Sequence, residues 1–258
     1  MSEGLAKRAV NEWRAGLLRV TAFLAREASL ENRNLWTELG LGEPEIHEKK
    51  KGQVTDQGLV LDHWLTISSA SSRIDWLYLP KPDVPEDVEE FGFSDVGPFP
   101  EAVDKYVGLI DGWLERECPK LSRFALGATI RLPVSDRLEG YKQLSAYLPF
   151  KIDGERSSDF LYQINRHRKS AVVPDLTVNR LTQWSVAGLT GLAGQVMFSA
   201  SGISPDLRKY GSSSACQAVL DINTDPENRT GFERKQVKAL LDEFVLMAKE
   251  IVAEGDIS

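Results

Sequence analysis

The chain has 258 residues, of which 42% are hydrophobic and 27% charged, and its formal net charge is −7. This is the composition of a globular protein, and no apolar run approaches the roughly 18 residues that a membrane helix requires. Cys118 and Cys216 lie far apart without a CxxC spacing and the N-terminus lacks a signal-peptide core, which predicts a cytoplasmic protein without a disulfide framework, metal or cofactor.

The first 118 residues are predicted to form an N-terminal α+β half. Leu17 to Arg26 alternates between apolar and polar residues, which is the pattern of a strand with one buried face. Residues 43–58 are charged and polar and are predicted to form an exposed loop. Two further strands, Leu59 to Ile67 and Arg73 to Leu79, are separated by a run of serines and predict a hairpin.

Residues 80–100 interrupt this regular pattern. They are rich in proline and acidic side chains, which is the composition of a linker or a surface excursion. A helix over residues 100–117 follows, because Pro100 suits the first position of a helix and apolar residues recur at steps of three and four. Residues 1–118 are therefore one predicted domain.

The second predicted domain spans residues 119–258. It opens with an alternating strand from Arg123 to Leu132, in which Arg123, Ala125, Gly127, Thr129 and Arg131 share one face. The elements that follow are a helix over 135–147, four strands over 159–166, 176–189, 195–200 and 214–222, a turn over 188–194, and a long amphipathic helix over 231–254.

The order of these elements predicts an α+β fold. Runs of neighbouring strands with few helices between them are typical of antiparallel sheets. We expect mostly antiparallel sheets with long amphipathic helices packed on one face, in two loosely similar halves.

The acidic excursion carries the first candidate binding surface. Aromatic side chains among acidic ones suit the docking of a basic protein partner. The residues concerned are Phe91, Phe93, Phe99, Glu89 and Glu90. The alternative is a loop that folds back on its own domain and buries the phenylalanines.

The densest basic run lies in the second half. It comprises Arg166, His167, Arg168 and Lys169, and Arg180 follows on the next predicted strand. If the two strands form a hairpin, its basic end is a candidate site for an anion or for nucleic acid. The alternative is a solvated hairpin end.

Enzyme motifs are absent from the sequence. It contains no Walker loop, GxGxxG, HExxH or kinase signature, and we assign no catalytic residue. Asp221 to Asp225 matches the start of a calcium loop, but Pro226 stands where that loop needs glycine, which favours a polar turn. A hydrolase or nuclease that uses scattered carboxylates such as Asp62, Asp75 or Asp221 stays open, because catalytic groups often converge from distant positions.

Residues 121–258 resemble a sporadically distributed, uncharacterised family of bacterial proteins. The similarity lies in the arginine-bearing strand Arg123 to Arg131, the Leu220-Asp221-Ile222-Asn223 strand and the closing helix. It implies an accessory protein of unknown activity from a bacterial mobile-element or antiviral defence locus, and it brings no catalytic residues.

We therefore expect a non-enzymatic binding protein, an accessory subunit that acts through a protein partner. Nucleic-acid binding by the basic hairpin and hydrolysis by scattered carboxylates are the alternatives. The sequence leaves the oligomeric state open.

Overall fold

The computed structural model of the protein describes residues 6–25, 30, 33–81, 92–199, 202–227 and 231–256. Within these ranges, only the backbone is described for residues 191–199 and 202–210. The predicted docking residues Phe91, Glu89 and Glu90 lie outside the described residues.

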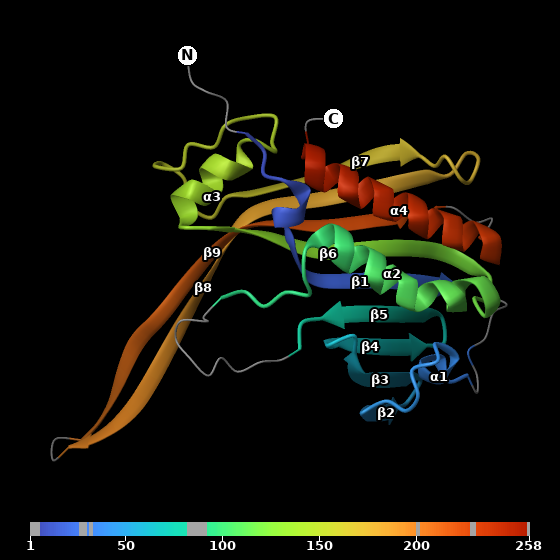
Figure 1. Ribbon diagram of the computed structural model, residues 1–258, viewed down its shortest axis with the longest axis horizontal. Coiled ribbons are helices and arrows are strands. Elements are labelled where there is room, and N and C mark those ends of the chain that lie inside the picture. The colour runs from blue at the N-terminus through green and yellow to red at the C-terminus, as the bar shows by residue number, and fades with distance from the viewer. Residues whose placement is uncertain are drawn as a thin grey trace.

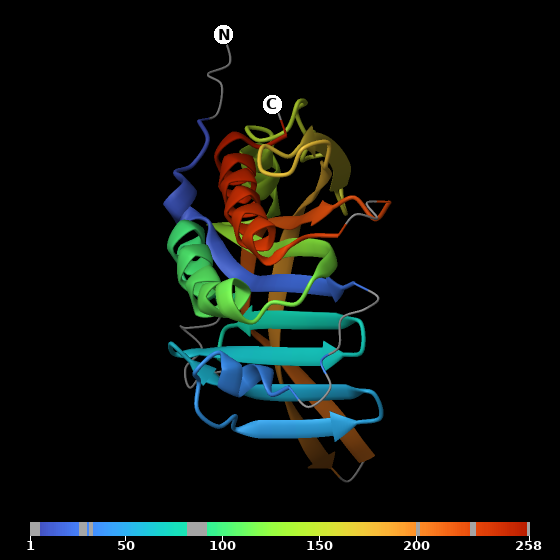
Figure 2. The same ribbon diagram turned by 90° about the vertical axis from the view of Figure 1, so that its right-hand side faces the viewer.

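The described residues form one nine-stranded antiparallel sheet, in the order β2-β3-β4-β5-β1-β6-β9-β8-β7 (Figures 1 and 2). Its strands are β1 (Arg14–Leu24), β2 (Ile46–Lys50), β3 (Gln53–Val60), β4 (His63–Ala70), β5 (Arg73–Leu79), β6 (Leu121–Val134), β7 (Leu161–Lys169), β8 (Thr177–Ser199) and β9 (Gly202–Thr224). The helices are α1 (Leu35–Glu38), α2 (Phe99–Arg116), α3 (Arg137–Leu144) and α4 (Arg234–Glu254), with a 3₁₀ turn, η1 (Val10–Glu12).

The predicted fold class is wrong. A single antiparallel sheet dominates the described part of the chain, instead of several sheets covered by long helices in two similar halves. The sheet runs without a break across the predicted domain boundary at residue 118, because β1 pairs with β6 along most of its length. Alternation identifies a strand locally, but it does not say which strand becomes its neighbour.

Two local predictions also need correction. Residues 43–58 are not a loop, since β2 and most of β3 lie there and pair from Ile46–Gln57 to Lys50–Gln53. Residues 188–194 are not a turn, since β8 continues through them to Ser199. Both segments are rich in charged residues or glycine, which have low strand propensity, and inter-strand pairing overrides that preference.

The helices pack on one face of the sheet. Figure 1 shows α2 and α4 side by side over the central strands, and Phe244 of α4 stacks on Phe124 of β6 with 6.1 Å between ring centroids. At the two flanks, Trp36 of α1 lies against Gly58, and Gly140 of α3 lies against Val186. No helix in the described ranges is long and apolar enough to cross a membrane.

The opposite face carries no helix in the described part of the chain. The alternate side chains of the central strands point to this open face, and most of them are half-buried. On β1 these are Leu17, Arg19 and Phe23. We call this surface the open face.

The β8–β9 hairpin extends beyond its neighbours. β7 pairs with β8 only as far as Ser185, and β6 pairs with β9 only from Ser214 onward. Residues 186–199 and 202–213 therefore form a two-stranded arm that projects from the sheet (Figure 1). Within the described residues its outer backbone edges have no partner strand, and such edges are available for pairing with another chain.

One tyrosine joins α2 to two central strands. The Tyr106 hydroxyl donates to the Trp76 carbonyl at 2.7 Å and accepts from the Val20 N–H at 2.8 Å. The side chain is fully buried, and burial raises its pKa above the ordinary value, so it stays neutral.

We expect Tyr106→Phe to lower the free energy of unfolding by about 1–3 kcal/mol, because two buried backbone groups lose their partner. Urea denaturation measures the change. Tyr141→Phe is the comparison, because its hydroxyl accepts a single hydrogen bond, from the Phe160 N–H at 3.3 Å, and a smaller loss is expected. An equal loss in both variants would contradict the bridging role of Tyr106.

Candidate functional site

The acidic excursion offers little docking surface among the described residues. Phe99 is fully buried at the start of α2 and is a core residue, so it is not displayed on the loop as predicted. Phe93 is half-buried under the Arg131 guanidinium, which lies 4.8 Å from the ring centroid. Phe93 is thus partly committed to an internal contact.

The predicted basic hairpin exists as β7 and β8, but two of its arginines, Arg166 and Arg168, are already paired. Arg166 makes two hydrogen bonds to the Asp256 carboxylate, at 2.9 and 3.1 Å. Arg168 makes two to Glu250, at 2.6 and 2.7 Å. Both acids belong to α4 or the residues just after it, so these charges attach the last helix to the edge of the sheet.

The other members of that run are separated by the alternation of the strands. Arg180 is only 7% exposed and faces the helix side, so it is not part of a basic surface. Burial is the main cause that lowers its pKa. His167 and Lys169 are exposed on the open-face side, where Lys169 donates to Thr177 and to the Asp175 carbonyl.

The acids named for hydrolysis do not converge. Asp75 on β5 accepts from Thr21 and pairs with Arg73, whereas Asp221 on β9 accepts from Asn223. Two strands, β1 and β6, lie between them. Asp62 lies in the turn between β3 and β4, away from both.

Cysteine and metal chemistry find no support in the described ranges. Both cysteines are buried, and burial raises the pKa of each thiol to about 12, so neither is a ready nucleophile. No group of three or more His, Cys, Asp or Glu side chains there could hold a metal ion.

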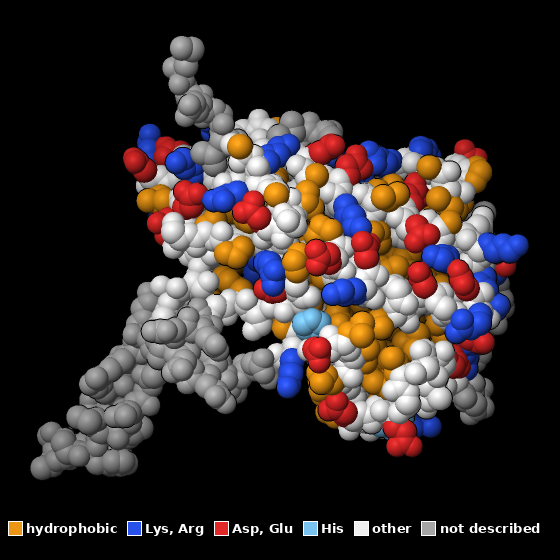
Figure 3. All heavy atoms as spheres, in the orientation of Figure 1, with side chains coloured by type: hydrophobic (Ala, Val, Ile, Leu, Met, Phe, Trp, Pro, Cys, Tyr) orange, Lys and Arg blue, Asp and Glu red, His pale blue; other side chains and the backbone are white. Residues whose placement is uncertain are grey.

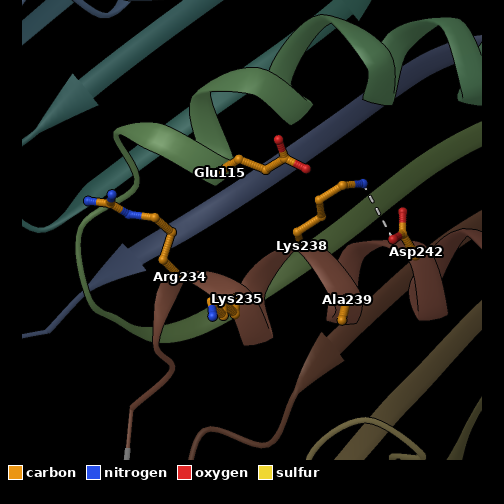
Figure 4. Close-up of a pocket in the computed structure, with 6 residues that line it drawn as sticks. All are labelled: Glu115, Arg234, Lys235, Lys238, Ala239 and Asp242. Carbon is orange, nitrogen blue, oxygen red and sulfur yellow. Dashed lines mark hydrogen bonds and ion pairs between the residues drawn. The ribbon is translucent and has the colours of Figure 1, made fainter.

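A shallow pocket of about 410 Å³ lies between the end of α2 and the start of α4 (Figure 4). Lys238 points across it to Asp242 and also pairs with Asp111 of α2. Its lining carries charges of both signs, and the Lys238–Asp111 pair joins the two helices.

On the open face, three arginine side chains from β1 and β6 lie in a line. Arg123 and Arg131 lie on one side of β6, four residues on either side of Gly127, and Arg19 of β1 is opposite Gly127. Four residues of strand span about 13 Å. The three side chains, Arg123, Arg19 and Arg131, form a line that we call the arginine row.

Two glycines make room for this row. A side chain on Gly127 would put its Cβ 3.4 Å from two nitrogens of Arg19, so that arginine lies across β6. A side chain on Gly16 would overlap the Arg131 guanidinium. Gly16 is the residue at which the register between β1 and β6 shifts, which suits glycine in a bulge.

Phe23 supports the far end of the row. The Arg123 guanidinium lies 4.9 Å from its ring centroid and that of Arg73 lies 5.3 Å away. Arg73 is neutralised by Asp75 at 2.6 Å. Arg123 has no carboxylate partner among the described residues, and its buried Nε has no acceptor there.

The other two arginines are also without a carboxylate partner in the part that the structure describes. Arg131 donates from Nε to the Gln217 side chain at 3.1 Å. Burial lowers its pKa and the charge of Asp95 offsets this only in part, but a guanidinium remains protonated. No hydrogen bond or ion pair joins Arg19 to another described residue.

A ladder of amide side chains runs beside the row. Asn165 donates to Asn179 at 3.2 Å, Asn179 donates to Asn223 at 3.1 Å, and Asn223 donates to Asp221 at 3.1 Å. These residues share the open face on β7, β8 and β9. The face thus combines arginine, aromatic and amide side chains, and the carboxylates of Asp75 and Asp221 also lie on it.

The helix side carries charges of both signs (Figure 3). Figure 3 shows acidic and basic side chains interspersed over that side, without a region of one sign. Sequence reasoning noted that Arg123 and Arg131 share a face of their strand but assigned them no role. The missing information was that β1 pairs with β6 and places Arg19 between them.

No protein-family model matches the chain, and a search of curated proteins gives no significant match. The resemblance of residues 121–258 to an uncharacterised bacterial family stays a prediction. Function is therefore inferred from the residues of this chain.

The paired Asp256 makes stability depend on pH. Burial raises the pKa of its carboxyl, but hydrogen bonds from Arg166 and Tyr162 outweigh this and hold the pKa below its ordinary value. Folding lowers the pKa of this carboxyl. Its contribution to the free energy of unfolding is therefore complete at pH values above the pKa in the unfolded state, about 3.9, and is lost as the pH falls through the pKa in the folded state.

We therefore expect Asp256→Asn to destabilise the protein near pH 6, and the difference from wild type to shrink as the pH falls to about 3. Urea denaturation at several pH values measures it. Asp104→Asn, which removes an exposed partner of Lys249, is the control and should have little effect at any pH. A difference for Asp256→Asn that stays constant with pH would contradict the assignment.

Proposed function

We propose that this chain is a non-enzymatic binding protein whose open face binds single-stranded nucleic acid. The observation that carries the proposal is the arginine row, three guanidinium groups without a carboxylate partner among the described residues of an acidic chain. An arginine fork matches the oxygens of a phosphate, and the row has the length to contact several nucleotides.

Two further features favour single-stranded over duplex nucleic acid. The planar guanidinium of Arg123 lies over the Phe23 ring, and unpaired bases can stack on such planar groups. The amide ladder presents donors and acceptors that suit exposed base edges. The open face is a sheet surface and not a projecting helix, which is the element that usually enters a DNA groove.

The test is fluorescence anisotropy with labelled single-stranded DNA, single-stranded RNA and duplex DNA over a range of salt. For three phosphate contacts on a single strand, the logarithm of the binding constant should fall with the logarithm of salt with a slope of about −2. In Arg19→Ala plus Arg123→Ala, the slope should approach about −0.7, because one contact remains.

The control is Arg166→Ala plus Arg168→Ala, which removes the same charge from β7. Circular dichroism verifies that both double variants fold. Binding lost only in the β7 variant would assign the function to the basic hairpin predicted from sequence. Absence of binding at low salt would overturn the nucleic-acid proposal, and partner binding through residues 80–100 would then be the function to test.

A further inference from the structure

A polar recess of about 750 Å³ lies on the helix side, at the β2–β4 edge of the sheet. Its floor is formed by β2, β3 and β4, and residues just before α1 form one wall. Trp36 of α1 packs on Gly58 of β3 and so sets the distance between α1 and the sheet. The volume is within the range of small-molecule sites.

A buried carboxylate and a histidine meet in this recess. Asp56 is only 4% exposed, and His47 Nδ1 lies 2.6 Å from its Oδ1. The two residues are directly opposite each other on β3 and β2. The His47 side chain is 55% exposed, so the pair joins a buried acid to an accessible ring.

Packing alone does not account for Asp56. The residues beside it in the same row of the sheet are Ile67 on β4 and then Trp76 on β5, both buried and apolar. A buried carboxylate costs free energy that an apolar side chain would not. Here the Asp56 carboxylate forms a hydrogen bond with Nδ1 of His47. The other ring nitrogen, Nε2, has no partner among the described residues.

The surrounding charges are mainly positive. Lys49 lies two residues from His47 and so points to the same side of β2, and it has no ion-pair partner in the described ranges. Arg33 and Lys50 also line the recess, although Glu38 neutralises Arg33 and Glu48 neutralises Lys50. Ser69 of β4 adds a hydroxyl.

We propose that this recess binds the phosphate of a phosphomonoester of nucleotide size. His47 contacts a phosphate oxygen through Nε2 while Asp56 orients the ring through Nδ1, and the Lys49 ammonium group supplies a positive charge. The site lies on the opposite side of the sheet from the arginine row and is independent of it.

The test is isothermal titration calorimetry of the full chain with orthophosphate, AMP and adenosine. AMP should bind more tightly than orthophosphate, and adenosine should bind far more weakly than AMP because it lacks the phosphate. Lys49→Ala and His47→Gln should each weaken AMP binding roughly tenfold or more, as expected for a lost charge-assisted hydrogen bond. Lys51→Ala is the matched control, since it removes the same charge from the next turn without lining the recess, and should change affinity less than twofold.

Equal losses in Lys49→Ala and Lys51→Ala, or no binding of AMP at millimolar concentration, would overturn the proposal. An oligonucleotide with and without a 5′-phosphate distinguishes a nucleic-acid end from a free nucleotide as the natural source. Arg19→Ala plus Arg123→Ala should leave AMP binding intact, so failure at this site and failure at the open face are separate results.

Discussion

The pairing of β1 with β6 is the contact on which the rest of the structure depends. It joins the strands of the N-terminal segment to those of the C-terminal segment into one sheet, with partners from Arg14–Arg131 to Leu24–Leu121. A strand pair in the middle of a sheet has its backbone groups paired on both edges, and the helices cover this pair on one face (Figures 1 and 2). The same pair also brings Arg19 between Arg123 and Arg131.

Charge pairing distinguishes the arginines of β7 from those of the arginine row. On β7, Arg166 and Arg168 form ion pairs with carboxylates that lie in α4 or just after it. These ion pairs help to attach α4 to the edge of the sheet. On the open face, the arginine row rests on glycine and phenylalanine instead. A half-buried guanidinium supported in this way keeps its hydrogen-bond donors for a ligand, and little conformational entropy is lost on binding because the side chain is already confined.

The two proposed sites use opposite sides of the same sheet. On the open face, donors from β1 and β6 are spread along a line that suits an extended polyanion. At the β2–β4 edge, His47, Asp56 and Lys49 are gathered in a recess that suits a small ligand. The alternation of side chains along β3 and β6 separates them, since neighbouring residues in a strand face opposite sides.

The sequence by itself determined the helices from residue 100 and residue 231, and most of the strands, because periodicity at 3.6 or 2 residues records which face of an element is buried. It also identified Arg123 and Arg131 as facing the same way. It failed for β2 and the outer part of β8, where charged residues and glycines have low strand propensity and the neighbouring strand supplies the hydrogen bonds. Only the tertiary structure decided that Phe99 is buried, that Arg166 and Arg168 are neutralised, and that His47 meets Asp56. Each of these depends on contacts between residues distant in sequence or on a register between strands, and a local pattern of residue types does not contain that information.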